Sequence, residues 1–189
     1  RNLIPKFDNI IVVGGMANNI LNHKGNKIGK SLKEENCELI INEIFENSKK
    51  YSCKVIYPDD VLVGKNINDK SKIREINNIG DDEIILDIGP KTVNKIKDII
   101  KISETVLWNG PAGYFENPEF SKGSKEIAKQ IVMRKRENKI YCVSGGGDTV
   151  AVLNNFGLVK DFDFVSTAGG AFLEFLEGKE LPGIKALNS

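Results

Sequence analysis

Residues 140–149 read Ile-Tyr-Cys-Val-Ser-Gly-Gly-Gly-Asp-Thr, and this stretch decides the fold. Its first residues are largely apolar and predict a buried strand, and the three glycines predict a tight turn. The sequence from Val150 onward predicts a helix. A strand whose side chains are almost all apolar is buried on both faces, as in a parallel sheet covered by helices. The stretch therefore indicates one strand–turn–helix unit of an α/β domain.

The same order of strand, turn and helix recurs along the chain. Strands are predicted at 10–13, 55–57, 84–87, 106–108, 140–143 and 162–165, and glycines follow all but the second of them. Helical spacing of apolar residues fills the intervals, at 37–45, 93–100 and 127–132. Such alternation with right-handed crossovers gives a doubly wound α/β domain. We therefore expect a Rossmann-like fold with a mostly parallel sheet of about six strands flanked by helices, with 64–82 as a surface excursion or small hairpin.

Composition excludes several classes of function. The chain has 27 Lys and Arg against 26 Asp and Glu, so no global field attracts nucleic acid or a membrane surface. We expect neither partner, and no run of apolar residues is long enough to span a membrane. Three cysteines without C-x-x-C spacing indicate neither a disulfide framework nor a zinc site, and they fit a reducing cytoplasm. His23 is the only histidine, which disfavours Ser-His-Asp and Cys-His catalysis.

The glycines stand where a ligand would bind. In an open parallel sheet, ligands bind beyond the carboxyl ends of the strands, and five glycine-bearing turns lie at these ends. Helix N-termini at the same edge offer free N–H groups that suit phosphates. We prefer a phosphate-bearing ligand to the simpler interpretation that the glycines only make turns. Neither a P-loop motif nor a Gly-x-Gly-x-x-Gly motif with a ribose-binding acid is present.

Two stretches carry the candidate ligand contacts. In the first, Gly146 and Gly147 let backbone approach a ligand, and Thr149 can donate its hydroxyl to a phosphate. Phosphates would repel Asp148 unless a Mg²⁺ ion lies between them, although Asp148 could instead cap the following helix.

The second stretch, 108–116, reads Trp-Asn-Gly-Pro-Ala-Gly-Tyr-Phe-Glu. It offers the Asn109 amide as a donor and Glu116 as an acceptor for the two hydroxyls of a ribose. Glu116 could equally be a helix-start acid or a surface residue. Trp108, Phe115 and Phe120 fit a core better than a stacking role.

Several blocks in order and spacing carry a family resemblance that runs from about Leu3 to the end. They are Gly14-Gly15-Met16-Ala17-Asn18, Ile28-Gly29-Lys30-Ser31-Leu32, Trp108-Asn109-Gly110-Pro111, Phe115-Glu116, Gly145-Gly146-Gly147-Asp148-Thr149, Ser166-Thr167, Gly169-Gly170-Ala171 and the stretch 173–183. In these blocks the chain resembles the phosphoglycerate kinase family.

The resemblance implies a fold, a reaction and roles for residues. The family enzyme has two Rossmann-like domains and transfers a phosphoryl group between 1,3-bisphosphoglycerate and ADP in glycolysis, giving 3-phosphoglycerate and ATP with Mg²⁺. Residues 1–189 would be its nucleotide-binding C-terminal domain. The implied contacts are Gly14, Gly15, Ile85 and Leu86 for adenine, Glu116 for ribose, Asn109 near the transferring phosphate, Gly146, Gly147 and Thr149 for phosphates, Asp148 for Mg²⁺, and Gly169 and Gly170 for a helix N-terminus facing the transferred group.

The chain also departs from the family pattern. The N-terminal phosphoglycerate domain and an early Gly-Gly-Ala-Lys strand-end motif do not occur in it, so we expect a core strand to be lost and the chain alone to be nearly inactive. Residues 173–189 would return toward the missing domain, and the family is usually monomeric. Ala168 replaces a glycine and Phe172 a small residue, either of which would crowd the phosphoryl site if the backbone there needs positive φ.

Two alternatives stay open. The chain could be a nucleotide-binding or interaction module without catalysis, or it could bind a different sugar phosphate or a dinucleotide on a similar fold.

Overall fold

The computed structural model describes residues 2–187, which form three hydrogen-bonded ladders of strands. Two ladders are parallel: β1 (Asn9–Ile11) with β2 (Lys54–Ile56), and β6 (Thr105–Asn109), β7 (Tyr141–Gly145) and β8 (Phe164–Ser166) in that order. The third ladder is antiparallel, with β3 (Asp60–Gly64) between β4 (Lys72–Glu75) and β5 (Ile84–Ile88).

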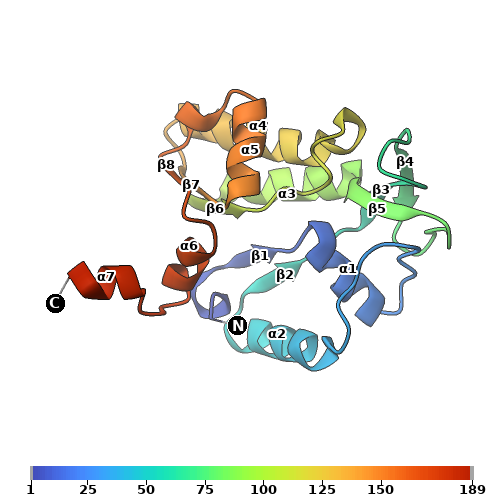
Figure 1. The fold of residues 1–189 in the computed structure, drawn as a ribbon, viewed down its shortest axis with the longest axis horizontal. Helices are drawn as coiled ribbons and strands as arrows, with labels where there is room; N and C mark the ends of the chain where they lie inside the picture. Colours follow the sequence, from blue (N-terminus) through green and yellow to red (C-terminus); the bar gives the residue numbers. More distant parts are fainter. Residues whose placement is uncertain (1, 188–189) are drawn as a thin grey trace.

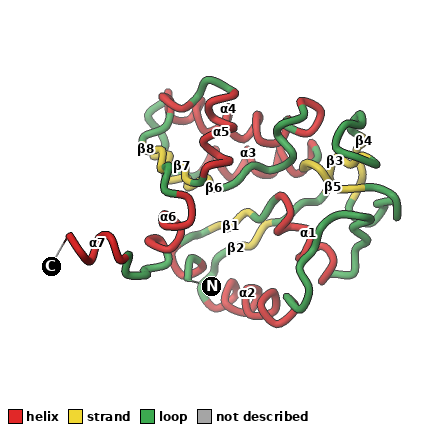
Figure 2. The backbone as a smooth tube through the Cα atoms, viewed as in Figure 1, coloured by secondary structure: helices red, strands yellow, loops and turns green. Residues whose placement is uncertain are grey.

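Helices cover the strands from both sides, as Figure 1 shows. The α-helices are α1 (Gly14–His23), α2 (Glu38–Lys50), α3 (Pro90–Ile102), α4 (Lys122–Arg136), α5 (Gly147–Asn155), α6 (Gly169–Leu176) and α7 (Pro182–Leu187). Three short 3-10 helices are η1 (Ile4–Lys6), η2 (Pro118–Phe120) and η3 (Val159–Asp161). Among residues 2–187, no helix combines the length and apolarity that a membrane span requires. The connections from β1 to α1 and from β7 to α5 are only two residues and one residue long, and Figure 2 shows the loops of the chain in green between its helices and strands.

The α/β fold with parallel strands flanked by helices is confirmed, and all six predicted strands are present as β1, β2 and β5 to β8. The segment 64–82 contributes one strand of a hairpin, β4, which folds back on β3, so the hairpin begins before the expected segment and its first strand is buried. The structure differs from the predicted parallel arrangement at β3 and β5. The run Asp60–Gly64 forms an additional strand that is buried along its whole length, and β5 pairs with it in antiparallel rather than parallel orientation.

The main core lies between the β6–β8 ladder and helices α3, α4 and α5. Trp108 belongs to it, Phe115 packs against it, and Phe120 is fully buried in a neighbouring cluster with Leu62 and Leu86. The expectation that these three aromatic side chains are core residues is therefore confirmed. Of the three cysteines, Cys53 and Cys142 are buried, and none of the three forms a disulfide.

Two strands at ladder edges are unusually apolar. Within residues 2–187, β1 pairs only with β2, and β6 pairs only with β7. Each therefore leaves one edge without a ladder partner. Ile10, Ile11, Val106 and Leu107 on these strands stay half-buried, although strands of parallel sheets are normally covered on both faces.

The C-terminal part leaves the body of the domain. Helices α6 and α7 contain no buried residue among those described, and α7 extends away from the strands in Figure 1. The Lys6 ammonium group donates a hydrogen bond to the Leu176 carbonyl oxygen at 2.8 Å, which joins the N-terminal η1 turn to the end of α6.

Candidate functional site

The carboxyl ends of three parallel strands finish level with one another. Asn109 on β6 and Ser166 on β8 both lie opposite Gly145, the last residue of β7. Helices α5 and α6 begin directly beyond this edge, at Gly147 and Gly169. A side chain added at Gly147 or Gly170 would meet no atom within 4 Å, so the edge is open surface next to two helix N-termini.

The turn from β7 into α5 requires glycine. Gly146 has φ of +89°, which residues with a side chain rarely adopt, and a Cβ there would lie 2.6 Å from Asn109 Oδ1. The amide of Asn109 therefore lies directly over the Gly146 backbone. Gly146 is also the N-cap of α5, and no side chain caps this helix. Asp148 therefore does not act as the cap that was considered as an alternative.

Asp148 is exposed in the first turn of α5. Its carboxylate makes no hydrogen bond or ion pair with the other described residues, and none of those residues builds a cluster of three metal-ligating side chains. One free carboxylate next to an open edge fits Mg²⁺ in the form in which it usually binds with nucleotides. In that form it is held by one or two carboxylates, substrate phosphates and water.

Thr149 lies beneath the edge rather than on it. The residue is fully buried, and its Oγ1 atom accepts the backbone N–H of Gly110 at 2.6 Å. This bond joins α5 to the loop that follows β6. The sequence predicted a direct phosphate contact for Thr149, and the structure gives its hydroxyl oxygen a partner within the protein.

The loop 110–116 is attached at alternate residues. Ala112 N–H donates to Ser124 Oγ at 2.8 Å, and Tyr114 N–H donates to the Leu86 carbonyl oxygen at 2.7 Å. Together with the bond from Gly110, three successive donors of the loop reach α5, α4 and β5. These long-range bonds fix the course of the loop 110–116, which follows Asn109 and has Glu116 as its last residue.

Asp87 supports the start of α4 behind this loop. Its carboxylate oxygens accept the N–H groups of Gly123 and Ile88, each at 2.8 Å. The side chain is almost completely buried, and this burial raises its pKa to about 7, against the lowering effect of the two N–H donors and Lys122. A buried acid at the end of an apolar strand is therefore a structural feature of the site.

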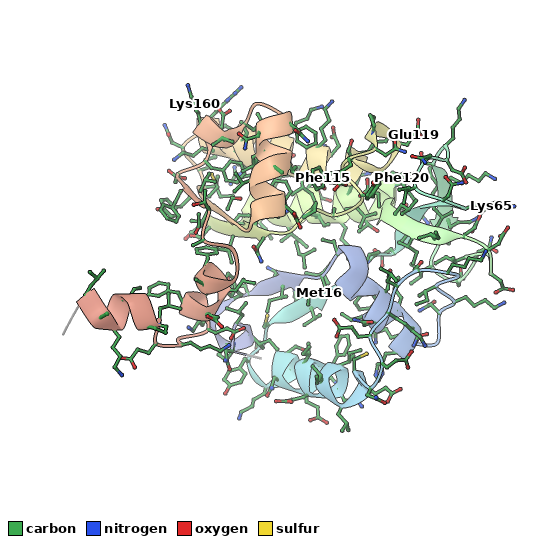
Figure 3. The ribbon with its side chains drawn as sticks, in the orientation of Figure 1. Met16, Lys65, Phe115, Glu119, Phe120 and Lys160 are labelled. Carbon is green, nitrogen blue, oxygen red and sulfur yellow. The ribbon has the colours of Figure 1, made fainter. Side chains whose placement is uncertain are left out.

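The turn from β1 into α1 lies against the same loop. Gly14 has φ of +60°, and a Cβ there would lie 3.4 Å from the Pro111 carbonyl oxygen. Gly15 has open space around it, and the neighbouring Met16, labelled in Figure 3, is 71% exposed. The ends of β1 and β6 therefore converge at one place, as the prediction for the glycines requires.

The adenine contact of Ile85 and Leu86 stays a prediction, and in the structure their side chains pack inside the domain. Ile85 packs against the cluster of Val61, Val63 and Ile79, and Leu86 lies in the cluster with Phe120, which Figure 3 labels. Both side chains belong to the protein core. What Leu86 offers the site is its carbonyl oxygen, which holds Tyr114.

Glu116 is exposed in a turn before η2, and its carboxylate contacts neither Asn109 nor Asp148. It is therefore a surface residue in this structure rather than a helix-start acid. No described contact brings it into the cluster formed by Asn109, Gly146 and Thr149.

The approach to α6 contains the two departures from the family pattern. Ala168 has φ of −79°, so the backbone there needs no positive φ and alanine fits. Phe172 lies on the strand end itself, because a Cβ at Gly145 would be 2.2 Å from its ring. A large aromatic ring therefore covers part of the edge between β7 and α6.

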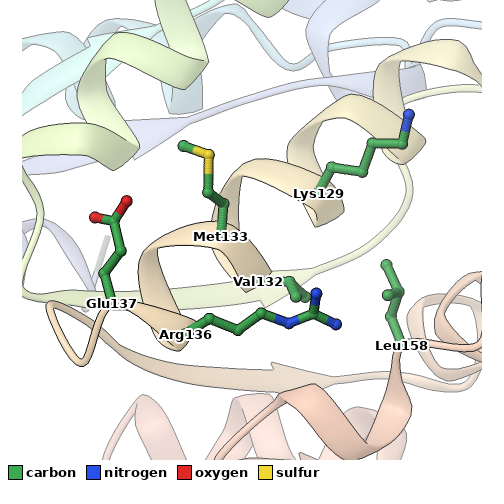
Figure 4. Close-up of a pocket in the computed structure, with 6 residues that line it drawn as sticks. All are labelled: Lys129, Val132, Met133, Arg136, Glu137 and Leu158. Atoms are coloured by element: carbon green, nitrogen blue, oxygen red, sulfur yellow. The ribbon is translucent and has the colours of Figure 1, made fainter.

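A separate recess lies at the other end of α4, as Figure 4 shows. It measures about 380 Å³ and is lined by Lys129, Val132, Met133, Arg136, Glu137 and Leu158. Gly123, which Asp87 holds, and Arg136 are far apart on this helix, about 20 Å at 1.5 Å per residue. The recess is therefore not part of the glycine-lined edge. The basic residues 134–136 form the last turn of α4, where the helix dipole favours positive charge.

Sequence reasoning missed Asp87 and Ser124 as residues of the site. A signal existed for Asp87, since an acid is unexpected within the apolar strand 84–88. No local signal identifies Ser124, because its partner Ala112 lies 12 residues away in a loop.

The family model described as "Phosphoglycerate kinase" matches residues 1–179. The protein named phosphoglycerate kinase from Zymomonas mobilis is 46% identical over 190 residues, covering 100% of this chain and 48% of its own length. The one from Xanthobacter autotrophicus is 44% identical, covering 98% of this chain and 48% of its own length.

Solved structures agree with the sequence comparisons. The phosphoglycerate kinase from Coxiella burnetii matches with a TM-score of 0.90 and 39% identity, over 98% of this chain and 48% of that one. The enzyme from Pyrococcus horikoshii OT3 matches with a TM-score of 0.75 and 26% identity, over 99% of this chain and 47% of that one. This chain thus spans about half the length of the curated relatives that it matches.

Proposed function

The chain belongs to the phosphoglycerate kinase family, and on that premise we propose that residues 1–189 supply the half that binds ADP or ATP with Mg²⁺. The observation that carries the proposal is the level edge at Asn109, Gly145 and Ser166, where two helix N-termini meet open glycine backbone. Such an edge offers N–H donors and a positive dipole end to phosphates, with few side chains in the way.

The residues of the edge would share the work of binding. Gly146 and Gly147 bring backbone N–H groups of α5 to the phosphates, and Asn109 donates its amide beside them. Asp148 would hold Mg²⁺, which supplies positive charge between the carboxylate and the phosphates. Gly14 and Gly15 leave room for adenine next to the loop 110–116, and Glu116 would accept from the ribose hydroxyls after closing on the ligand.

The complete reaction needs more than this half. We propose phosphoryl transfer between 1,3-bisphosphoglycerate and ADP, in which α6, beginning at Gly169 and Gly170, faces the transferred group. Catalysis of this type rests on positioning and electrostatic stabilisation rather than on covalent chemistry by the protein. Residues 173–189 would contact the half that binds phosphoglycerate; Asn188 and Ser189 lie outside the described residues. We also propose a cytoplasmic, monomeric protein acting in glycolysis.

Two measurements test this proposal. Calorimetric titration of the chain with ADP should show binding that strengthens when Mg²⁺ is added. A coupled assay with 1,3-bisphosphoglycerate should show almost no ATP formation by the chain alone. Absence of nucleotide binding would refute the proposal for the site, and substantial ATP formation by these 189 residues would refute the proposed division of labour.

The Phe172 ring favours a second candidate function, a nucleotide-binding module without catalysis. The ring covers Gly145 at the strand end that faces α6, where the transferred group would need access. A separately produced N-terminal half of a family member distinguishes the two candidates. Restored ATP formation supports the kinase, whereas nucleotide binding without restored activity supports the module.

A further inference from the structure

We infer that Ser124 is a positioning residue for the nucleotide: its hydroxyl oxygen holds the Ala112 N–H and thereby keeps loop 110–116 in its binding course. This inference rests on the proposed function and deepens it. The loop directly follows Asn109, the last residue of β6, whose amide lies over Gly146, so holding the loop limits how far that strand end and its amide can move.

Of the residues that hold the loop, Ser124 is the one that can be mutated without also removing a candidate ligand contact. Of the three acceptors that hold the loop, the Leu86 oxygen is backbone, and Thr149 is itself a candidate ligand contact. Ser124 is fully buried in the first turn of α4 and has no place among the candidate ligand contacts. Its partner Ala112 is 1% exposed, so water cannot replace the lost acceptor unless the loop moves.

The position of Ser124 is itself fixed. The preceding residue, Gly123, donates its N–H to Asp87, and a Cβ at Gly123 would lie 2.4 Å from Asp87 Oδ1. The start of α4 therefore sits directly on a buried carboxylate. A chain of bonds runs from the end of β5 through α4 to the loop, and Ser124 is its last member.

Removing the Ser124 hydroxyl should weaken nucleotide binding because it loosens the loop in the protein without ligand. Without an acceptor for Ala112, the loop samples other courses, and the nucleotide must restore the ordered one when it binds. For Ser124→Ala we expect affinity for ADP in the presence of Mg²⁺ to fall about tenfold, as for loss of one buried hydrogen bond. Ser124→Thr keeps the hydroxyl and should stay within about threefold of the wild type, a small change on the free-energy scale.

The matched control is Ser48→Ala. Ser48 is also a buried helical serine, and its hydroxyl donates to the Phe45 carbonyl within α2, away from the strand ends. It should lower the melting temperature without moving the dissociation constant. If Ser124→Ala does not fold, Ser124→Cys replaces it, because cysteine fills similar space and its sulfur is only a weak acceptor. Its affinity for ADP with Mg²⁺ should then fall in the same way.

The titrations separate the inference from the function on which it rests. If the wild-type chain does not bind ADP with Mg²⁺, the proposed function fails. If the wild type binds and Ser124→Ala binds equally well, only the role of Ser124 fails. Amide exchange on the wild type gives an independent reading: Ala112 should exchange slowly before ADP is added, and rapid exchange that slows only with ADP would overturn the inference.

Discussion

The Oγ1 atom of the fully buried Thr149 accepts the N–H of the half-buried Gly110 across 39 residues of sequence, at 2.6 Å. This bond fastens the loop after one strand to the helix after the next, at the place where Asn109 meets Gly146. A side chain that appeared in the sequence as a ligand contact is thus part of the framework that shapes the site.

Replacement of Thr149 by valine should test this framework. The valine keeps the shape of the side chain but leaves the Gly110 N–H without an acceptor, which costs on the order of 1–3 kcal/mol in unfolding free energy. Urea denaturation measures the loss. Thr149→Ser retains the acceptor and should lose less; equal losses for the two variants would show that packing of the methyl group, and not the bond, stabilises the turn.

Asp148 should matter for metal-dependent binding only. Because its carboxylate is exposed, Asp148→Asn should leave stability within about 0.5 kcal/mol of wild type. Affinity for ADP with Mg²⁺ should drop about tenfold or more, since metal ligands carry much of such binding, while affinity for ADP in EDTA should hardly change. Asp98→Asn, at an exposed carboxylate that pairs with Lys101 on α3, serves as the control. An unchanged metal-dependent affinity would remove Asp148 from the site.

Asp87 should give the chain an unusual dependence of stability on pH. Burial raises its pKa to about 7 in the folded protein from an ordinary 3.8, so folding takes up a proton between these values. Its contribution to stability is therefore fully present below about pH 4 and is lost as pH rises through 7. Most other shifted carboxyls act oppositely: the Arg74 guanidinium lowers the pKa of Glu83, whose contribution appears as pH rises.

Comparing wild type with Asp87→Asn isolates this effect. The difference in unfolding free energy between the two proteins should shift by on the order of a few kcal/mol between pH 4 and 8, in the direction of relative loss for the wild type. Urea titrations across this range provide the measurement. Parallel curves for the two proteins would mean that Asp87 does not titrate in this range.

Two glycine-to-alanine changes should have opposite effects on stability. At Gly113 a Cβ would lie 2.4 Å from the Leu86 carbonyl oxygen and 2.6 Å from Asp87 Cβ, so Gly113→Ala should cost about 1–3 kcal/mol. At Gly15, in the first turn of α1, a Cβ meets no atom within 4 Å, and alanine should add up to about 1 kcal/mol. Thermal denaturation of the two variants and the wild type measures these changes as shifts in melting temperature. Gly15→Ala should nevertheless weaken ADP binding if adenine lies against that backbone.

The sequence predicted the repeating units well because glycine turns and apolar strands are local patterns. The strand ending in Gly145 and the helix after Gly147 could be read from ten consecutive residues. Pairings between distant segments could not. The antiparallel partner of β5, the bond from Gly123 to Asp87 across 36 residues and the burial of the Thr149 hydroxyl all depend on which segments meet. The spacing of apolar residues along the sequence does not indicate which distant segments pair.

Among the described residues, β1 and β6 each have one unpaired edge, and this has a consequence for how the chain behaves in solution. Both strands run toward the same loop, and the free edge of each offers backbone N–H and C=O groups to a strand of another molecule. The monomer should therefore self-associate in concentrated preparations, and a short soluble peptide of alternating valine and threonine should suppress the association by pairing with these edges.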